Sequence, residues 1–271
     1  LKRSIFPEKR NIFDNKERAY PSAASFYNTI SPDTEYLVFA HQDIFFADPE
    51  WFTKAEKILD GVEFGVVGSA GVRWDGSRVG NMMYGWWKYP LPQKDLEEVA
   101  TLDEQLLIVR REVFEKVKFD EKTFDGWHLY GADYCLQVKK KLGLPSYVIN
   151  LPVIHNTSRG NVKGFLKYAE RLLQKYPEYE PIPTTCGTIS RKWIKYRKRI
   201  EKIEPAYRKI FPGVEEFIES KREGSLLVLS YNRYLKYSIT PPFEHFPLFI
   251  PAFGMKFEKR EFNPQGKWGT I

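Results

Sequence analysis

Four short apolar runs, separated by segments with helical character, constrain this chain more than any other feature of its sequence. They lie between Tyr36 and His155, and each has the length and composition of a buried strand. Strands that alternate with helices predict a layered α/β domain, in which helices cover a central sheet. The predicted strands are residues 36–40, 64–72, 106–110 and 146–154.

Helix signals fill the intervals between these runs. Asp48 is a favourable cap, a proline follows it, and Gly61 marks an end, so we expect a helix between the first two strands. A second helix should begin near Gly131 and end at KKKLG, where positive charge complements the helix C-terminus. Two further amphipathic helices are predicted at residues 160–176 and 189–211.

The composition of the 271 residues excludes several classes of protein. Hydrophobic residues make up 42% and aromatic residues 16%, which is enough to form a core and rules out wholesale disorder. The 2 cysteines, Cys135 and Cys186, form no CxxC pair, so a disulfide framework and a cysteine-based zinc site are excluded. The sequence has neither a long apolar span nor the apolar core of a signal peptide, and we expect a cytoplasmic protein.

The net charge of the chain favours an anionic partner. Lys and Arg number 42 against 35 Asp and Glu, which gives +7 at pH 7. Much of this excess lies in the 189–211 segment, and a basic amphipathic helix suits peripheral contact with the anionic inner face of a membrane. A charge run is usually a solvated face, so no specific nucleic-acid partner is expected.

The segment EYLVFAHQDIFF places metal-ligating residues at the end of a strand. His41 and Asp43 are two residues apart, and on a strand such side chains share one face with their Cα atoms about 6–7 Å apart. An imidazole and a carboxylate at a strand end can therefore approach one divalent ion. Alone, the same pattern also fits a solvated strand end whose polar side chains satisfy backbone groups.

Several motifs over about residues 11–160 make the chain similar to a known enzyme family. They are SAASFYNTISPDTEYLVFAHQD, TLDEQLLIVRREVF, FDEKTFDGWHLYGADYCLQVKKKLG and SYVINLPVIHNTSRG. In this order they resemble the family-2-type inverting glycosyltransferases of GT-A fold, in particular a branch with HQD in place of DxD. The resemblance implies a GT-A-like mixed sheet sandwiched by helices in a nucleotide-sugar and catalytic domain at residues 1–160. A helical, basic and partly irregular extension would follow at residues 161–271.

The resemblance implies a metal site at the strand end. In that family the acidic motif holds a divalent metal, Mn²⁺ or Mg²⁺, which bridges the diphosphate of the nucleotide-sugar donor. By position this role falls to Asp43, with His41 as a ligand or a diphosphate contact. His155 ends SYVINLPVI, where many relatives have a histidine, and would complete the metal shell. A lone histidine at a strand end is more often a structural residue.

The general base implied by the resemblance is the aspartate near the start of a helix, which is Asp133 in YGAD. It would take the proton of the acceptor hydroxyl as that oxygen attacks the anomeric carbon. Asp125 is a rival for this role, and either carboxylate can instead cap a helix. By resemblance Trp127 and His128 would line the acceptor or sugar pocket, although a tryptophan there is equally an ordinary core residue.

The same resemblance implies contacts with the donor. Asp103 and the Arg110-Arg111 pair match the segment under the donor sugar, where a carboxylate accepts sugar hydroxyls and an arginine neutralises phosphate. Arg111 can equally be an exposed helix residue. Upstream, Asp14 and Asn28 correspond in position to contacts with the base or ribose of the nucleotide.

One departure from the family concerns its first strand. Members normally start with a strand and a helix before the acidic turn, and this chain begins too late to contain them. The segment at residues 225–233, which includes LLVLS, looks like that strand, and we hypothesise that it returns to the central sheet beside residues 36–40. In the alternative interpretation LLVLS is a local core strand.

The sequence thus predicts an inverting glycosyltransferase of polysaccharide biosynthesis. It would move a sugar from a nucleotide-diphosphate donor to a hydroxyl of a glycan or of a lipid-linked acceptor. Two alternatives remain open at this point: a glycosyltransferase-like protein without activity, because His41 and Ala132 replace acidic residues of the family, and a module that binds an anionic surface or nucleic acid.

Overall fold

A computed structural model describes residues 20–41, 43–46, 48–84, 87–156 and 164–198, and the backbone of three strands between residues 226 and 260. The chain divides into two compact units. The first comprises Leu1–Asn156 and Lys163–Ile194, and the second comprises Thr157–Val162 and Lys195–Ile271. No helix in these described ranges has the length and apolar character needed to cross a bilayer.

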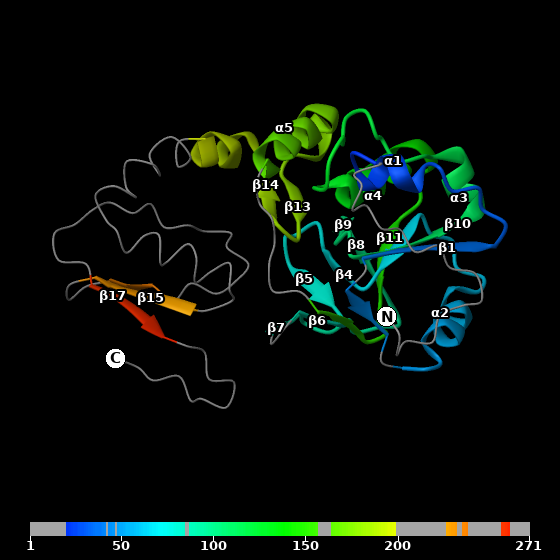
Figure 1. The fold of residues 1–271 in the computed structure, drawn as a ribbon, viewed down its shortest axis with the longest axis horizontal. Coiled ribbons are helices and arrows are strands. Elements are labelled where there is room, and N and C mark those ends of the chain that lie inside the picture. Colours follow the sequence, from blue (N-terminus) through cyan, green and yellow to red (C-terminus); the bar gives the residue numbers. More distant parts are fainter. Residues whose placement is uncertain are drawn as a thin grey trace. The chain divides into compact units, whose positions relative to one another are not determined.

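A five-stranded mixed sheet forms the centre of the first unit (Figure 1), as the resemblance implied. Its strand order is β1-β10-β3-β11-β8. β11 runs parallel to β3, while the other neighbouring pairs are antiparallel. The strands are β1 (Tyr36–Ala40), β10 (Leu106–Arg110), β3 (Val66–Gly68), β11 (Ser146–Ile149) and β8 (Leu96–Val99).

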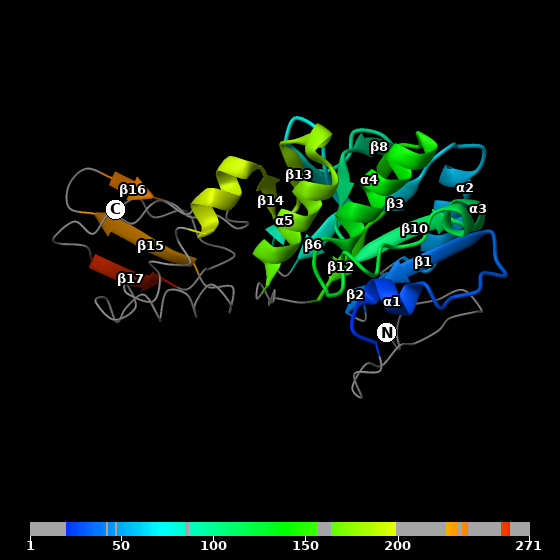
Figure 2. The same cartoon turned by 90° about the horizontal axis from the view of Figure 1, so that it is seen from above.

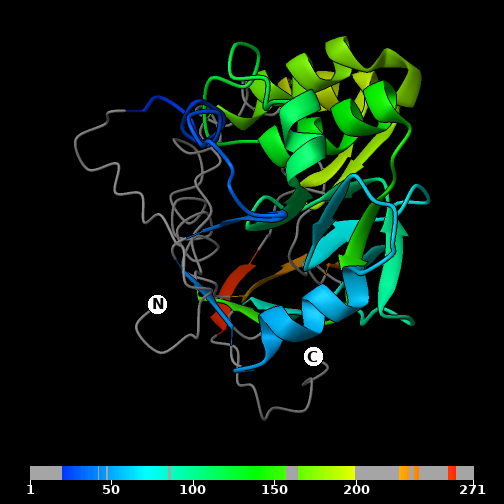
Figure 3. The same ribbon diagram turned by 90° about the vertical axis from the view of Figure 1, so that its right-hand side faces the viewer.

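Alternate residues of these strands enter two different cores. On β1, Leu37 and Phe39 join a core with helices α1 (Ala23–Tyr27), α3 (Arg111–Lys116), α4 (Tyr130–Leu142) and α5 (Phe165–Lys175). Tyr36 and Val38 face the opposite core, which α2 (Trp51–Leu59) covers. This period of two is what a sheet buried on both faces requires. Figure 3 shows α2 on one side of the sheets and the helices of the first core on the other.

The predicted helices of this unit are confirmed with small shifts at their ends. α2 begins at Trp51, and Asp48 lies before it, where its carboxylate accepts hydrogen bonds from the Glu50 N–H and the Lys54 ammonium. α4 ends at Gly143, whose φ of +74° is the left-handed value that favours glycine. Residues 191–198 are helical, so the described part of the 189–211 prediction is confirmed; residues 199–211 lie outside the described ranges.

Two of the predicted strands are each divided in the structure. The 64–72 run becomes β3 and β4 (Ala70–Val72), and the chain changes sheet at Ser69, whose hydroxyl accepts a hydrogen bond from Gln105. The 146–154 run becomes β11 and β12 (Val153–His155), because Pro152 between them has no N–H to donate to a ladder. Each of these apolar runs thus predicted buried strand, but neither revealed that its two halves belong to different sheets.

Smaller sheets flank the central one and carry its loops. β12 lies between β2 (Ile44–Phe45) and β6 (Met82–Tyr84), and Figure 2 shows β12 beside β2. β7 (Trp87–Lys88) pairs with β6 at the edge of that sheet. The remaining elements of the first unit are β5 (Arg78–Gly80) and β9 (Thr101–Leu102) on either side of β4, the hairpin β13 (Ile182–Thr184) and β14 (Gly187–Ile189), and the short helix η1 (Pro177–Tyr179).

The second unit contains a three-stranded sheet. β15 (Leu226–Tyr231) pairs with β16 (Leu235–Tyr237) on one edge and with β17 (Lys256–Arg260) on the other. Both edges of β15 are therefore occupied, whereas the described partner of β1 is β10. The return of residues 225–233 to the central sheet stays a hypothesis.

Candidate active site

A cluster of two histidines and an aspartate lies where β1 ends. β12 and β2 are antiparallel with His155 opposite Ile44, and this register places His155 beside the preceding Asp43. The His155 Nε2 and the Asp43 Oδ1 are 3.2 Å apart. The His41 ring, one residue beyond β1, has its centroid 5.7 Å from that of His155. The structure thus brings together the three residues that the sequence assigned to a metal.

This cluster has the dimensions of a cation site. One ligand atom from each of His41, Asp43 and His155 lies within 4.8 Å of the others, a spacing that a single ion can bridge. Two imidazoles and one carboxylate suit a divalent transition metal better than Mg²⁺, which prefers oxygen ligands. His155 is buried, and His41 and Asp43 are partly exposed, so the cluster is open on one side. The donor set therefore fits a metal that also binds a ligand from solution.

Burial keeps His41 in the neutral form that a metal requires. Burial lowers the pKa of His41, and the nearby Asp103 carboxylate opposes this effect. The Nε2 of His41 lies 3.1 Å from the hydroxyl of Tyr130, the first residue of α4. This contact links the cluster to the start of α4, and Asp103 lies close enough to His41 to act on its charge.

Glu104, which the sequence analysis did not single out, packs against the start of α4. A Cβ at Gly131 would lie 2.8 Å from the Glu104 Cγ, so the side chain of Glu104 fills the space that this glycine leaves. The N–H of Leu129 donates a hydrogen bond to the Glu104 carboxylate, and Leu129 adopts a φ of +61°, which is unusual for a leucine. Such strain concentrates at functional sites. In the sequence, the one feature that could have indicated a role for Glu104 was its position beside Asp103 in TLDEQ.

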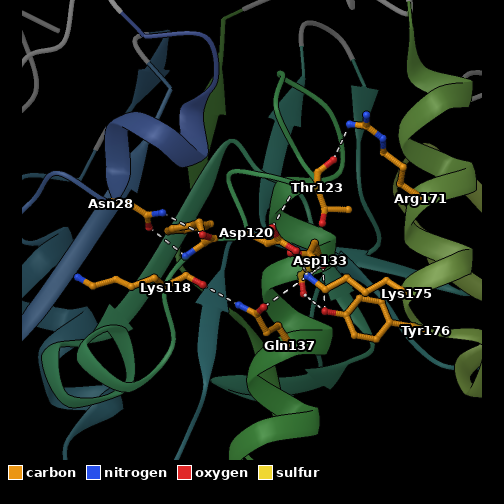
Figure 4. Close-up of polar contacts among 10 residues, drawn as sticks. Asn28, Lys118, Asp120, Thr123, Asp133, Gln137, Arg171, Lys175 and Tyr176 are labelled. Atoms are coloured by element: carbon orange, nitrogen blue, oxygen red, sulfur yellow. Dashed lines mark hydrogen bonds and ion pairs between the residues drawn. The ribbon is translucent and has the colours of Figure 1, made fainter.

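Asp133 lies elsewhere, in a polar network between α4 and α5 (Figure 4). Its side chain is 1% exposed, and its Oδ1 accepts hydrogen bonds from the Lys175 Nζ at 2.7 Å and the Tyr176 hydroxyl at 2.9 Å. Lys175 also binds the Asp120 carboxylate at 2.7 Å. Burial raises the pKa of Asp133 to about 6, although Lys175 opposes the shift. The Oδ1 atom therefore joins α4 to α5, while the Oδ2 atom is buried and has no hydrogen-bond partner among the described residues.

Asp125 fixes the loop before α4 to α5. Its Oδ1 accepts hydrogen bonds from Arg171 at 2.7 Å and from the Tyr168 hydroxyl at 3.0 Å, and Lys167 adds an ion pair at 3.2 Å. Burial alone would raise the pKa of Asp125, but these donors lower it overall. The carboxylate is therefore held ionised by residues of α5 and anchors the loop to that helix.

Trp127 and His128 lie in the loop that Asp125 anchors. The Trp127 side chain is 51% exposed, so its ring is a free face and the interpretation as an ordinary core residue is wrong. The His128 ring lies 5.8 Å from that of Phe165 at the start of α5, measured between centroids. An exposed indole beside a partly buried imidazole is consistent with the predicted contact with sugar or acceptor.

The predicted donor contacts at Arg110, Arg111 and Asn28 have other roles in the structure. The register of β1 and β10 pairs Tyr36 with Arg110, so both arginines lie at the opposite end of the strands from His41. Arg110 binds Glu35 and two carbonyls at the end of α2, and Arg111 is an exposed residue that begins α3. The Asn28 amide exchanges two hydrogen bonds with the backbone of Phe119. Asp14 lies outside the described residues.

Fold and site together define a class of protein. A mixed α/β sheet between helices, with a carboxylate and an imidazole after one strand and a second imidazole at the end of another, is consistent with a GT-A-like glycosyltransferase domain. The model of a family described as glycosyltransferase-like matches residues 15–176, well over half of the chain, and the chain belongs to this family. It is thus a transferase of sugars. No curated protein matches the chain.

Proposed function

We propose that this glycosyltransferase transfers a sugar, with inversion, from a nucleoside-diphosphate donor to a hydroxyl of a glycan or lipid-linked acceptor. The observation that carries the proposal is the cluster of His41, Asp43 and His155, whose ligand atoms lie within 4.8 Å of one another. Bound there, a divalent cation would offset the negative charge that develops on the departing diphosphate. The two imidazoles favour Mn²⁺ over Mg²⁺.

Residues around the cluster would position the sugar. Asp103 is partly exposed and acts on the charge of His41, so its carboxylate is placed to accept hydrogen bonds from sugar hydroxyls near the diphosphate. Trp127 offers an exposed ring on which the apolar face of a sugar can pack, and His128 can add a hydrogen bond. These contacts would hold the anomeric carbon for attack from the side opposite the diphosphate.

The experiment is a donor screen on the purified chain. UDP-, GDP-, ADP- and dTDP-sugars are incubated with Mn²⁺ or Mg²⁺, and release of the nucleoside diphosphate is measured in the presence and absence of glycan acceptors. We expect turnover with one donor class, faster with Mn²⁺, and loss of turnover in Asp43→Asn. Asp60→Asn, an exposed aspartate after α2, is the matched control and should keep full activity. Failure of every donor would contradict the proposal.

Inversion is tested on the product of the same reaction. The configuration of the new anomeric bond, read by NMR from its proton coupling constant, should be opposite to that of the donor. A product that retains the donor configuration would require a covalent glycosyl-enzyme or an equivalent double displacement and would contradict this part of the proposal.

The helix at residues 191–198 supports a peripheral contact with an anionic membrane, which would suit a lipid-linked acceptor. Its exposed basic residues include Arg191, Lys192, Lys195 and Lys198. Basic helices of this kind bind anionic lipid through electrostatic attraction, which added salt weakens by screening the charges. Sedimentation with vesicles tests it: binding to phosphatidylserine vesicles that falls with added salt is expected, and equal binding to neutral vesicles would contradict it.

A further inference from the structure

The proposed reaction requires a group that accepts the proton of the acceptor hydroxyl, and a cation binds each of the two sequence-predicted carboxylates. The Oδ1 of Asp133 accepts hydrogen bonds from Lys175 and Tyr176, while its buried Oδ2 has no partner among the described residues. Asp125 is bound by Arg171, Tyr168 and Lys167 of α5. A base that no bound cation neutralises must be another carboxylate near the cluster. Asp103 and Glu104 are the acidic residues next to the cluster in the described part of the chain that these networks do not hold.

Glu104 has the placement that such a base requires. Its side chain lies over Gly131, where a Cβ would come within 2.8 Å of the Glu104 Cγ and 3.2 Å of its Cα. The preceding residue, Tyr130, contacts the His41 imidazole at 3.1 Å. The Glu104 side chain therefore packs on the residue that follows Tyr130, whose hydroxyl contacts a proposed metal ligand, and Glu104 itself is not one of the three ligands.

One oxygen of this carboxyl group is without a partner. The Leu129 N–H donates to Glu104, while the Oε1 atom is buried and forms no hydrogen bond with any residue that the structure describes. A buried carboxyl oxygen without a partner is destabilising, and in a native site a ligand or a catalytic role can explain such a group. In contrast, the Oδ1 of Asp103 accepts the Gln105 N–H within its own turn.

We infer that Glu104 is the catalytic base of the transfer, an inference that rests on the proposed function. As the bond between the anomeric carbon and the phosphate oxygen breaks, its electrons leave with the nucleoside diphosphate. The acceptor oxygen forms the new bond to the anomeric carbon, and its proton passes to the free oxygen of Glu104. Release of the proton to solvent after the product departs restores the carboxylate. Gly131 is then the residue that leaves room for this side chain.

The electrostatics of the site suit a base that binds a proton readily. Burial, and then the nearby Asp103 carboxylate, raise the pKa of Glu104 to about 8. The other titratable groups that face Glu104 are Tyr27 of α1, Tyr130 and Cys135 of α4, and Cys186 between β13 and β14. The pKa of each of these four is raised further, to about 12 for Tyr27 and Cys135. Glu104 is thus the group of this set expected to titrate near pH 8.

The test compares Glu104→Gln and Glu104→Asp with wild type, using a donor that the wild-type screen has identified. Glutamine keeps the size of the side chain and cannot take the proton, so we expect kcat to fall about 10²- to 10⁴-fold. The affinity for Mn²⁺ and the nucleoside diphosphate should stay within about twofold, because Glu104 is not a ligand. Glu104→Asp should recover part of kcat, and Glu98→Gln, an exposed glutamate on β8, is the control for the substitution.

A pH profile separates a base from a packing residue. Wild-type kcat/KM should rise with pH through about 8, because the reaction needs the deprotonated carboxylate, and this limb should disappear in Glu104→Gln. A kcat of Glu104→Gln equal to that of the wild-type protein would overturn the inference and leave the proposed function intact. Parallel loss of diphosphate affinity and kcat, with no recovery in Glu104→Asp, would also overturn it. Absence of turnover in the wild-type protein would remove the proposed function and this inference with it.

Discussion

The packing of Glu104 over Gly131 predicts that a methyl group added to the glycine will be tolerated only when the glutamate is removed. In a helix, Gly→Ala normally stabilises by about 0.5–1 kcal/mol, because alanine loses less backbone entropy on folding. Here the new Cβ would lie 2.8 Å from the Glu104 Cγ, closer than real Cβ atoms approach a neighbour. Overpacking of this kind costs about 1–3 kcal/mol. Gly131→Ala should therefore be neutral or destabilising by up to about 2 kcal/mol.

In a Glu104→Ala background the same substitution should behave differently. Removal of the Cγ leaves the Glu104 Cα at 3.2 Å and Cβ at 3.4 Å from the new methyl, which is tight but tolerable. Gly131→Ala should then stabilise by up to about 1 kcal/mol, and the double-mutant cycle should give a coupling energy of about 1–3 kcal/mol. Urea unfolding of the four proteins at one pH measures it. Equal stabilisation in both backgrounds would refute the contact between Glu104 and Gly131.

Two further predictions concern the network between α4 and α5. Lys175→Met should destabilise by about 3 kcal/mol, because it leaves the 1% exposed side chain of Asp133 without its cation. Burial alone would raise the pKa of Asp120, but hydrogen bonds from Lys175 and Thr123 lower it to about 2. A lowered pKa stabilises the fold above about pH 4, and this stabilisation is lost as pH falls toward 2. The free energy of unfolding should therefore fall less between pH 5 and pH 2 in Asp120→Asn than in wild type, by up to roughly 2 kcal/mol.

Both predictions are checked by urea unfolding, the second as a series between pH 5 and pH 2. Lys140→Met is the control for Lys175→Met, because its ion pair with Glu178 is exposed and contributes little to stability. If the two methionine variants lose the same stability, Lys175 does not neutralise a buried charge. If the free energy of unfolding of Asp120→Asn falls between pH 5 and pH 2 by as much as that of wild type, other carboxylates cause the loss of stability in acid.

The predicted site residues that the structure brings together are those that lie at the ends of apolar runs. His41 and Asp43 follow directly from a strand that ends in polar residues, and His155 ends a second apolar run. The structure brings them together because β12 and β2 pair antiparallel, with His155 opposite Ile44. A layered α/β sheet and the helices α2, α4 and α5 were likewise predicted from short-range signals of period and capping, whereas the mixed character of the sheet was implied by the family resemblance.

The residues that were misplaced depend on pairings that no local pattern reveals. Arg110 is the last residue of a predicted strand, and only the antiparallel register with Tyr36 places it at the far end from His41. Asp133 lies near the start of a predicted helix, but the contact of α4 with Lys175 and Tyr176 of a later segment directs its carboxylate into the interior. Glu104 escaped notice because its place depends on a missing side chain at Gly131.

The central claim, that His41, Asp43 and His155 hold a cation against the donor diphosphate, is tested most directly by Mn²⁺ binding measured with electron paramagnetic resonance. Wild type should bind one Mn²⁺ more tightly when a nucleoside diphosphate is present, since each ligand completes the site of the other. Asp43→Asn should weaken Mn²⁺ binding at least about tenfold and abolish this coupling, while Asp60→Asn should match wild type. Unchanged Mn²⁺ and diphosphate binding in Asp43→Asn would contradict the account.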